Sequence, residues 1–266
     1  MELFEKFIKV LTDQGVTRGV AIAYLIISAL LAVLIVVALV LRIIVVVKYF
    51  EGNHTQTKNG KTSFEVAEEA LKKAGLDDVK IKKAGILRAF FIGNSYSVRK
   101  KTIYLRGSIA KKDSITAVSL AMQKVAIAKM DHTGNKMVRV RNTSQILSLV
   151  GPILFVPIVL VGMVVDYLLF DTLSMFSVIA IAVAFVIVIA GFVETLLNIP
   201  VERKANKMAL EMITKDNLLD AEEIKVAKKV FDAYIVAYIC EFIVAVVRMI
   251  QLILEVVIKS QINNKK

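Results

Sequence analysis

The sequence predicts a bundle of about four membrane-spanning helices that carries a small cytoplasmic α+β unit. Apolar residues make up 57% of the 266-residue chain, and the mean hydropathy of +0.67 is higher than in most soluble domains. These apolar residues are gathered in four long runs, and a run of about 20 residues crosses a bilayer. The charged residues, 35 Lys or Arg and 23 Asp or Glu, lie mainly between the runs.

The chain begins with a segment that we expect to lie in the membrane interface, residues 1–19. Its apolar residues recur at helical spacing and would face lipid: Leu3, Phe4, Phe7, Ile8 and Leu11. A secretory signal would have a basic start and a small-residue cleavage site, and this segment has neither. Residues 20–50 then form the first predicted span, and its apolar run, residues 20–47, is interrupted only by Arg42.

Residues 51–145 are predicted to form the cytoplasmic unit. After a polar linker at 52–60, Thr62 and Glu65 have the spacing of a capping box at a helix start. The helix would end near Gly75. The remaining expected elements are strands at 79–81, 86–91 and 102–105, a turn at 94–97, and a helix from Ser114 that Gly134 ends.

That last helix has apolar residues at three- and four-residue spacing, which predicts an amphipathic helix with one buried face. The residues that define this face are Ile115, Val118, Met122, Val125 and Ala126.

Residues 146–197 are predicted to form a transmembrane hairpin, with spans at 146–165 and 175–197. Pro152 and Pro157 would kink or break the first of these spans. The acidic connection at 166–174 is expected outside, and residues 198–230 would return as a cytoplasmic helical loop. A fourth transmembrane or interfacial span at 231–258 precedes a basic tail at 259–266.

The positive charge is concentrated where a cytoplasmic segment would lie. Residues 51–141 hold 19 Lys or Arg against 8 Asp or Glu. Cytoplasmic segments next to membrane spans carry such an excess, so the lipid bilayer, and not nucleic acid, is the expected partner.

Three of the charged residues in the fourth span lie at seven-residue spacing, so they share one face: Glu241, Arg248 and Glu255. Charge inside a membrane is a functional hypothesis, with Glu241 and Arg248 as the expected pair. The stripe could serve a structural or transport role of the bundle, or it could simply pack against the other helices or lie at the interface.

Metal-binding side chains are scarce. The only cysteine is Cys240, which we expect to be buried as a small apolar residue, and the only histidines are His54 and His132. A cluster of Asp131, both histidines and Glu202 is conceivable, but the spacing of these residues matches no metal motif.

Four ordered blocks resemble the YugP-like neutral zinc metallopeptidases, a family of membrane-bound bacterial enzymes. The blocks are the segment from Asn59 to Ile81, the segment 94–105, the Ser114 helix, and residues 198–202 with Ala205 and Ala209. The resemblance covers most of residues 58–255. It implies a zincin-like unit, zinc as cofactor, and a bacterial plasma membrane location with that unit cytoplasmic.

In that family the Ser114 helix carries an HExxH motif, two imidazoles one turn apart and a glutamate that activates the metal-bound water. Here Gln123 and Ile127 occupy the places of the histidines, and Lys124 that of the glutamate. Ala126 replaces a glycine of the motif. Only Glu202 remains of the metal-binding set.

Two further segments depart from the family's pattern. Lys204 replaces its usual Asp or Asn, and of its Asp-His-Tyr-Asp-Pro segment only Tyr96 remains. Tyr96 and Lys204 are possible residues of the former active-site cleft.

The substitutions predict a catalytically inactive, pseudoprotease-like membrane protein that has no metal and no catalytic residue. An amide and a hydrocarbon are poor zinc ligands, and an ammonium group repels the ion. Glu202 is expected to contact Lys124 or Lys204 instead. The former cleft would bind a peptide or membrane-protein partner, with an extended segment pairing along the strand 102–105. A divergent, active zinc metallopeptidase is the alternative.

Overall fold

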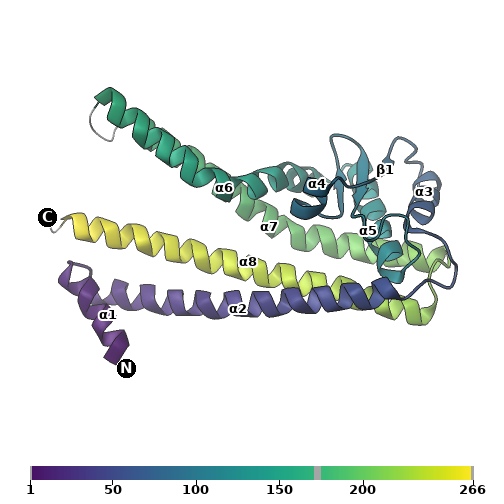
Figure 1. The fold of residues 1–266 in the computed structure, drawn as a ribbon, viewed down its shortest axis with the longest axis horizontal. Coiled ribbons are helices and arrows are strands. Elements are labelled where there is room, and N and C mark those ends of the chain that lie inside the picture. Colours follow the sequence, from purple (N-terminus) through teal and green to yellow (C-terminus); the bar gives the residue numbers. More distant parts are fainter. Residues whose placement is uncertain (1, 171–174, 265–266) are drawn as a thin grey trace. The chain divides into compact units, whose positions relative to one another are not determined.

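The computed structural model describes residues 2–170 and 175–264 and is mostly helical, with one small sheet (Figure 1). The chain divides into two compact units, unit 1 (Met1–Ile44 and Val236–Lys266) and unit 2 (Val45–Ile235). In chain order the elements are α1 (Glu2–Asp13), α2 (Arg18–His54), α3 (Ser63–Lys73), β1 (Lys80–Lys83), α4 (Ile86–Phe91), β2 (Ser95–Ser97), β3 (Thr102–Leu105), α5 (Ile115–His132), α6 (Lys136–Phe170), α7 (Met175–Lys215) and α8 (Ala221–Asn264).

Unit 1 contains α1, the first part of α2 and the last part of α8. The predicted N-terminal helix is confirmed as α1, where Ile8 packs against Val16, Ala21 and Ile258. Gln251 Nε2 donates to Ser28 Oγ at 2.9 Å, which ties α8 to α2 within this unit. Most of the large apolar side chains of α2 are exposed, as expected for a helix that faces lipid.

Two helices of the described residues are long and apolar enough to cross a membrane, Arg18–His54 and Ala221–Ile262, and Pro157–Leu169 is a shorter apolar helix. The four predicted spans are therefore matched in part. Residues 171–174 of the predicted outer connection and the last two residues of the basic tail lie outside the described residues.

In unit 2, α6 and α7 pack closely against one another. A Cβ built on Gly162 of α6 would lie 2.8 Å from the Phe176 carbonyl oxygen, so only glycine allows this approach. Asp166, expected in an outer connection, caps α7 instead, because its carboxylate accepts from the backbone N–H groups of Phe176 and Ser177 at 3.0 and 2.7 Å. The helix α6 continues through Pro152 and Pro157, so these prolines do not break it.

The capping box at α3 is confirmed. Glu65 N donates to Thr62 Oγ1 at 3.4 Å, and Thr62 N donates to Glu65 Oε2 at 2.8 Å. Gly75 follows the helix with φ of +66°, a conformation that glycine adopts without strain.

The sheet has the order β1-β3-β2, with β1 parallel and β2 antiparallel to β3. The strand prediction at 102–105 is confirmed as β3, but this strand is central and both its edges are paired. The proposed pairing of a partner along 102–105 is therefore wrong, because no free edge remains there.

Two predictions next to the sheet were also wrong. Residues 86–91 form the helix α4, not a strand, because Leu87, Arg88 and Ala89 favour helix and a short apolar run has no decisive period. Residues 94–97, expected as a turn, include β2, where Tyr96 pairs with Ile103. The pairing partner overrides the weak strand propensity of two serines.

The helix α5 forms the centre of unit 2. Its backbone begins at Ser114, whose Oγ accepts from Ala117 N at 3.3 Å, and it ends before Gly134, which has φ of +79°. Sixteen of its 18 residues are buried. The prediction of one buried face was therefore wrong, because α3, α7 and the sheet pack around the helix.

Candidate functional site

The buried polar side chains of unit 2 gather between α5 and α7. Gln123, Lys124 and Ile127 of α5 are all buried, as are Glu202 and Asn206 of α7. Gln123 Nε2 donates to Asn206 Oδ1 at 2.5 Å. Gln123 and Lys124 therefore face the segment that follows Pro200, which lies inside the continuous helix α7.

Glu202 is held by two cations, and we name Lys124, Arg141 and Glu202 the ion-pair cluster. Lys124 Nζ lies 3.4 Å from Glu202 Oε1, and Arg141 Nη2 donates to the same oxygen at 2.6 Å. The three side chains are 7%, 11% and 1% exposed, respectively. The predicted contact of Glu202 with a lysine is thus confirmed for Lys124.

The cluster continues toward the apolar part of α7. Arg141 Nε donates to Asn198 Oδ1, and Asn198 Nδ2 donates to Glu194 Oε1 at 2.7 Å. Glu202 Oε2 is buried without a hydrogen-bond partner among the described residues. Oε1 of Glu202 thus contacts both Lys124 and Arg141, and Oε2 is shielded from water.

The electrostatics of the cluster follow from its burial. Burial lowers the pKa of Lys124 below its ordinary value of 10.5, although the Glu202 carboxylate opposes this shift. Burial alone would raise the pKa of Glu202. The positive charges of Lys124 and Arg141 offset this effect, so the pKa of Glu202 is below its ordinary value of 4.5.

The residues present do not fit a zinc ion. Zinc needs imidazole, thiolate or carboxylate ligands, and α5 offers an amide, an ammonium and an alkyl group at the three motif positions. The remaining carboxylate, Glu202, is neutralised by two cations that both contact its Oε1. Within the described part of the chain, no group of three or more His, Cys, Asp or Glu is placed to hold a metal.

Tyr96, named from the sequence as a possible cleft residue, is buried on β2. Its hydroxyl donates to Asp131 Oδ2 at 3.1 Å, and Arg139 Nε donates to Asp131 Oδ1 at 3.0 Å. Burial, and then the negative charge of Asp131, raises the pKa of Tyr96. Asp131 thus accepts hydrogen bonds from both Tyr96 and Arg139. Of the other residues in the cluster considered from the sequence, His54 hydrogen-bonds through Nδ1 to the Phe50 carbonyl oxygen at 2.7 Å.

Lys204 lines a cavity of ≈ 460 Å³ beside the ion-pair cluster. The wall is formed by the end of α5, the start of α6 and the middle of α7, and it is mainly apolar. The lining residues are Met130, Asn135, Lys136, Met137, Pro200, Val201 and Lys204. Because Val201 precedes Glu202 in the chain, this cavity is the hollow nearest the former motif among those described.

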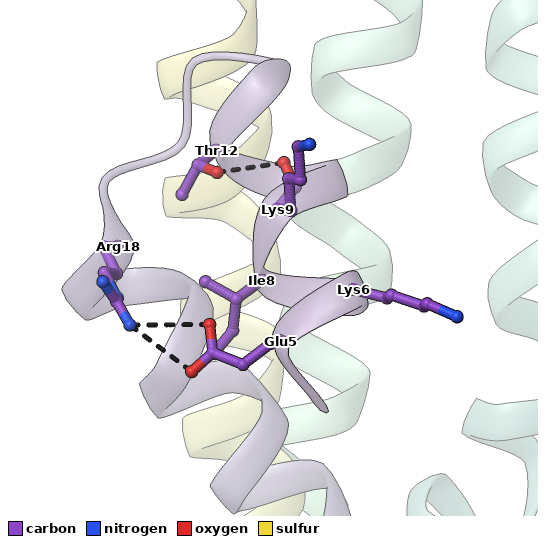
Figure 2. Close-up of a pocket in the computed structure, with 6 residues that line it drawn as sticks. All are labelled: Glu5, Lys6, Ile8, Lys9, Thr12 and Arg18. Atoms are coloured by element: carbon purple, nitrogen blue, oxygen red, sulfur yellow. Dashed lines mark hydrogen bonds and ion pairs between the residues drawn. The ribbon is translucent and has the colours of Figure 1, made fainter. Parts of the chain in front are cut away.

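A second hollow lies in unit 1, where α1 meets α2, and also measures ≈ 460 Å³ (Figure 2). Arg18 Nη2 lies 3.4 Å from Glu5 Oε1 at its wall, and Thr12 Oγ1 donates to the Lys9 carbonyl oxygen at 2.9 Å. Both partners of this ion pair are more than half exposed, so the hollow is an open groove.

The charged residues of the fourth predicted span have partners other than the predicted one. Glu241 Oε1 lies 2.5 Å from Arg42 Nη2, within unit 1. Arg248 Nη1 lies 3.5 Å from Glu255 Oε1 and also donates to Gln251. The expected Glu241–Arg248 pair is thus replaced by contacts to Arg42 and Glu255.

Sequence reasoning missed Arg141, Asn198 and Asn206. Arg141 was counted among the basic residues that flank a span, because nothing in its immediate sequence marks it as buried. Its place beside Glu202 follows only once α6 packs against α7.

The comparisons with known proteins identify the family of the chain. A family described as "Putative neutral zinc metallopeptidase" matches residues 25–257, so the chain belongs to that family. Neither the curated proteins nor the solved structures contain a match to the chain.

Proposed function

We propose that this chain is a non-catalytic member of its metallopeptidase family, a pseudoprotease in which an ion-pair cluster takes the place of the metal. The supporting observation is the contact of Lys124 and Arg141 with Glu202, at 3.4 and 2.6 Å. A dication placed there would displace both cations or be repelled by them. Peptide hydrolysis by a metal-bound water therefore has no support from these side chains.

We propose that the protein lies in a bacterial plasma membrane with four spans, and that residues 51–145 and 198–230 are cytoplasmic. The two candidate spans and the apolar helix at Pro157–Leu169 support membrane insertion. The excess of Lys and Arg at 51–141 supports the cytoplasmic orientation.

The cavity lined by Lys204 is the proposed binding site for a peptide or a membrane-protein segment. Its apolar wall could take one apolar side chain, while Lys136 and Lys204 at its border could bind acidic groups or backbone carbonyl oxygens. An extended segment could lie against this surface without any chemical step.

A binding experiment with a matched control tests this site. Fluorescein-labelled unstructured peptides would be titrated against the full chain, the Met137→Arg variant and the Val140→Arg variant. Met137 lines the cavity and Val140 does not, yet both are about half exposed on α6. We expect saturable binding that only Met137→Arg abolishes, and equal binding by all three proteins would contradict the proposal.

A divergent but active metallopeptidase is the second candidate, and family membership favours it. It requires zinc bound to the protein and zinc-dependent cleavage of an unstructured substrate. Cleavage that disappears in a Glu202→Ala variant would establish this alternative.

A further inference from the structure

The short helix α4 has an apolar surface that remains exposed in unit 2. Its four large apolar side chains are exposed to different degrees: Ile86 by 90%, Leu87 by 75%, Phe90 by 76% and Phe91 by 48%. We name these residues the α4 patch. The surface of a soluble protein rarely exposes so many large apolar side chains side by side, and such a patch indicates a contact with a membrane or a partner.

The backbone around the patch is held firmly, so the exposure belongs to a defined structure. The Arg88 guanidinium stacks 3.9 Å from the centre of the Tyr104 ring and donates to Ser95 Oγ at 3.0 Å. Arg106 Nε donates to the Ala89 carbonyl oxygen at 3.0 Å. The polar side of α4 thus faces the sheet, and the apolar side is turned outward.

The surroundings of the α4 patch are positively charged. Residues 79–112 contain ten Lys or Arg and no Asp or Glu. Lys82 and Lys83, which precede α4 in the chain, are exposed, and so is Arg106, which donates to Ala89 of α4. The nearest acids in the chain are Asp78 and Asp113, and Asp78 is paired with Lys101. Apolar side chains inside a basic border match a bilayer surface with anionic headgroups.

The short distance between α4 and the apolar part of α6 favours lipid over another partner. Asn142 of α6 donates to the Tyr96 carbonyl oxygen at 2.7 Å and accepts from Val98 N at 3.3 Å, so β2 lies beside Asn142. The apolar run of α6 begins at Ile146, four residues or about 6 Å further along the helix. Arg88 joins α4 to β2, and α4 lies on the side of the sheet from which the hairpin of α6 and α7 extends (Figure 1).

We propose that the α4 patch inserts into the interface of an anionic bilayer and fixes the sheet and α5 against the membrane surface. This inference rests on the proposed membrane placement of α6. Nucleic acid is a poorer occupant, because bases stack on aromatic rings, and half of the α4 patch is aliphatic.

Tryptophan reporters test the inference, because the chain contains no Trp. The full chain with Phe90→Trp would be reconstituted into phosphatidylcholine–phosphatidylglycerol vesicles that contain lipids brominated on their acyl chains. Leu160→Trp, an exposed site in the apolar part of α6, reports whether that helix is in the bilayer. Glu68→Trp, an exposed site on α3, serves as the solvent control.

We expect Phe90→Trp and Leu160→Trp to emit at shorter wavelength and to be quenched by brominated lipid, and Glu68→Trp to remain unquenched. Adding Lys82→Glu and Lys83→Glu should reduce the quenching at position 90 but leave that at position 160 unchanged. Quenching at 160 without quenching at 90 would overturn the inference and keep the topology. No quenching at either position would overturn both.

Two further outcomes identify other occupants and overturn the lipid assignment. A short-wavelength emission at position 90 without quenching by brominated lipid would show that protein covers the patch. Quenching of the detergent-solubilised protein by an added single-stranded oligonucleotide, but not by brominated lipid, would assign the patch to nucleic acid.

Discussion

Lys124 Nζ lies 3.4 Å from Glu202 Oε1, across the interface of α5 and α7, at two positions that the sequence resemblance aligns with the zinc site of the family. Arg141 reaches the same oxygen from α6. Three helices thus meet at one carboxylate, and the fold keeps a buried charge centre although the residues do not suit a metal.

The first prediction concerns the asymmetry of the ion-pair cluster. Glu202→Leu should lower the free energy of unfolding by about 3–5 kcal/mol, because it leaves two buried cations without a partner. Lys124→Met should change it by only about 1 kcal/mol, since Arg141 still neutralises Glu202. Denaturant unfolding of the purified variants in mild detergent measures both values. Equal losses for the two variants would contradict a shared carboxylate.

The second prediction is a pH dependence of the same cluster. The pKa values of Glu202 and Lys124 are both lower in the folded protein than their ordinary values of 4.5 and 10.5. Between the folded and the ordinary pKa the unfolded chain binds more protons, so each group makes stability rise with pH. Glu202 contributes stability that is lost as pH falls below 4.5, and Lys124 adds stability as pH rises toward 10.5.

The measurement is the free energy of unfolding of wild type and of Lys124→Met from pH 7 to pH 10. Wild type should gain stability relative to the variant over this range. A constant difference between the two proteins would show that Lys124 keeps an ordinary pKa.

The third prediction compares two glycines of one helix, α2. A Cβ on Gly52 would lie 2.5 Å from Thr116 Oγ1, in the core of unit 2, so Gly52→Ala should cost about 1–3 kcal/mol through overpacking. Nothing lies within 4 Å of a Cβ on Gly19. Gly19→Ala should therefore stabilise the helix by roughly 0.5–1 kcal/mol. Thermal unfolding of both variants checks the difference, and two similar shifts would contradict the close packing at Gly52.

The fourth prediction restores the metal motif. A variant with Gln123→His, Lys124→Glu, Ile127→His and Arg141→Met should bind zinc, because positions 123, 124 and 127 belong to the helix α5 that packs against α7 near Glu202. The same variant with Arg141 retained should bind zinc roughly tenfold or more weakly, since the guanidinium competes for Glu202. Zinc titration with a competing chelator measures both affinities. Equal affinities would exclude a role of Arg141 in replacing the metal.

Those elements of the fold that depend on neighbouring residues could be predicted from the sequence. The capping box at Thr62, the helix from Ser114 and the strand at 102–105 all depend on a few neighbouring residues. The contact of Glu202 with Lys124 also followed, because the resemblance placed both at one former metal site. The helix at 86–91 and the strand at 95–97 did not follow, because their tertiary neighbours decide them.

The partners that other helices and strands bring to the site were harder to predict. Arg141 lies 61 residues before Glu202, and its sequence neighbourhood resembles any basic border of a span. Tyr96 is buried and donates to Asp131 of α5, a contact that its sequence neighbours do not predict. Such long-range partners depend on helix packing, which periodicity does not encode.

The zinc content of the purified full chain tests the central claim most directly. The protein would be expressed in zinc-supplemented medium, purified without chelators and measured by elemental mass spectrometry beside its Glu202→Ala variant. We predict far less than one zinc per chain in both proteins. Close to one zinc per wild-type chain, lost in Glu202→Ala, would contradict the replacement of the metal by Lys124 and Arg141.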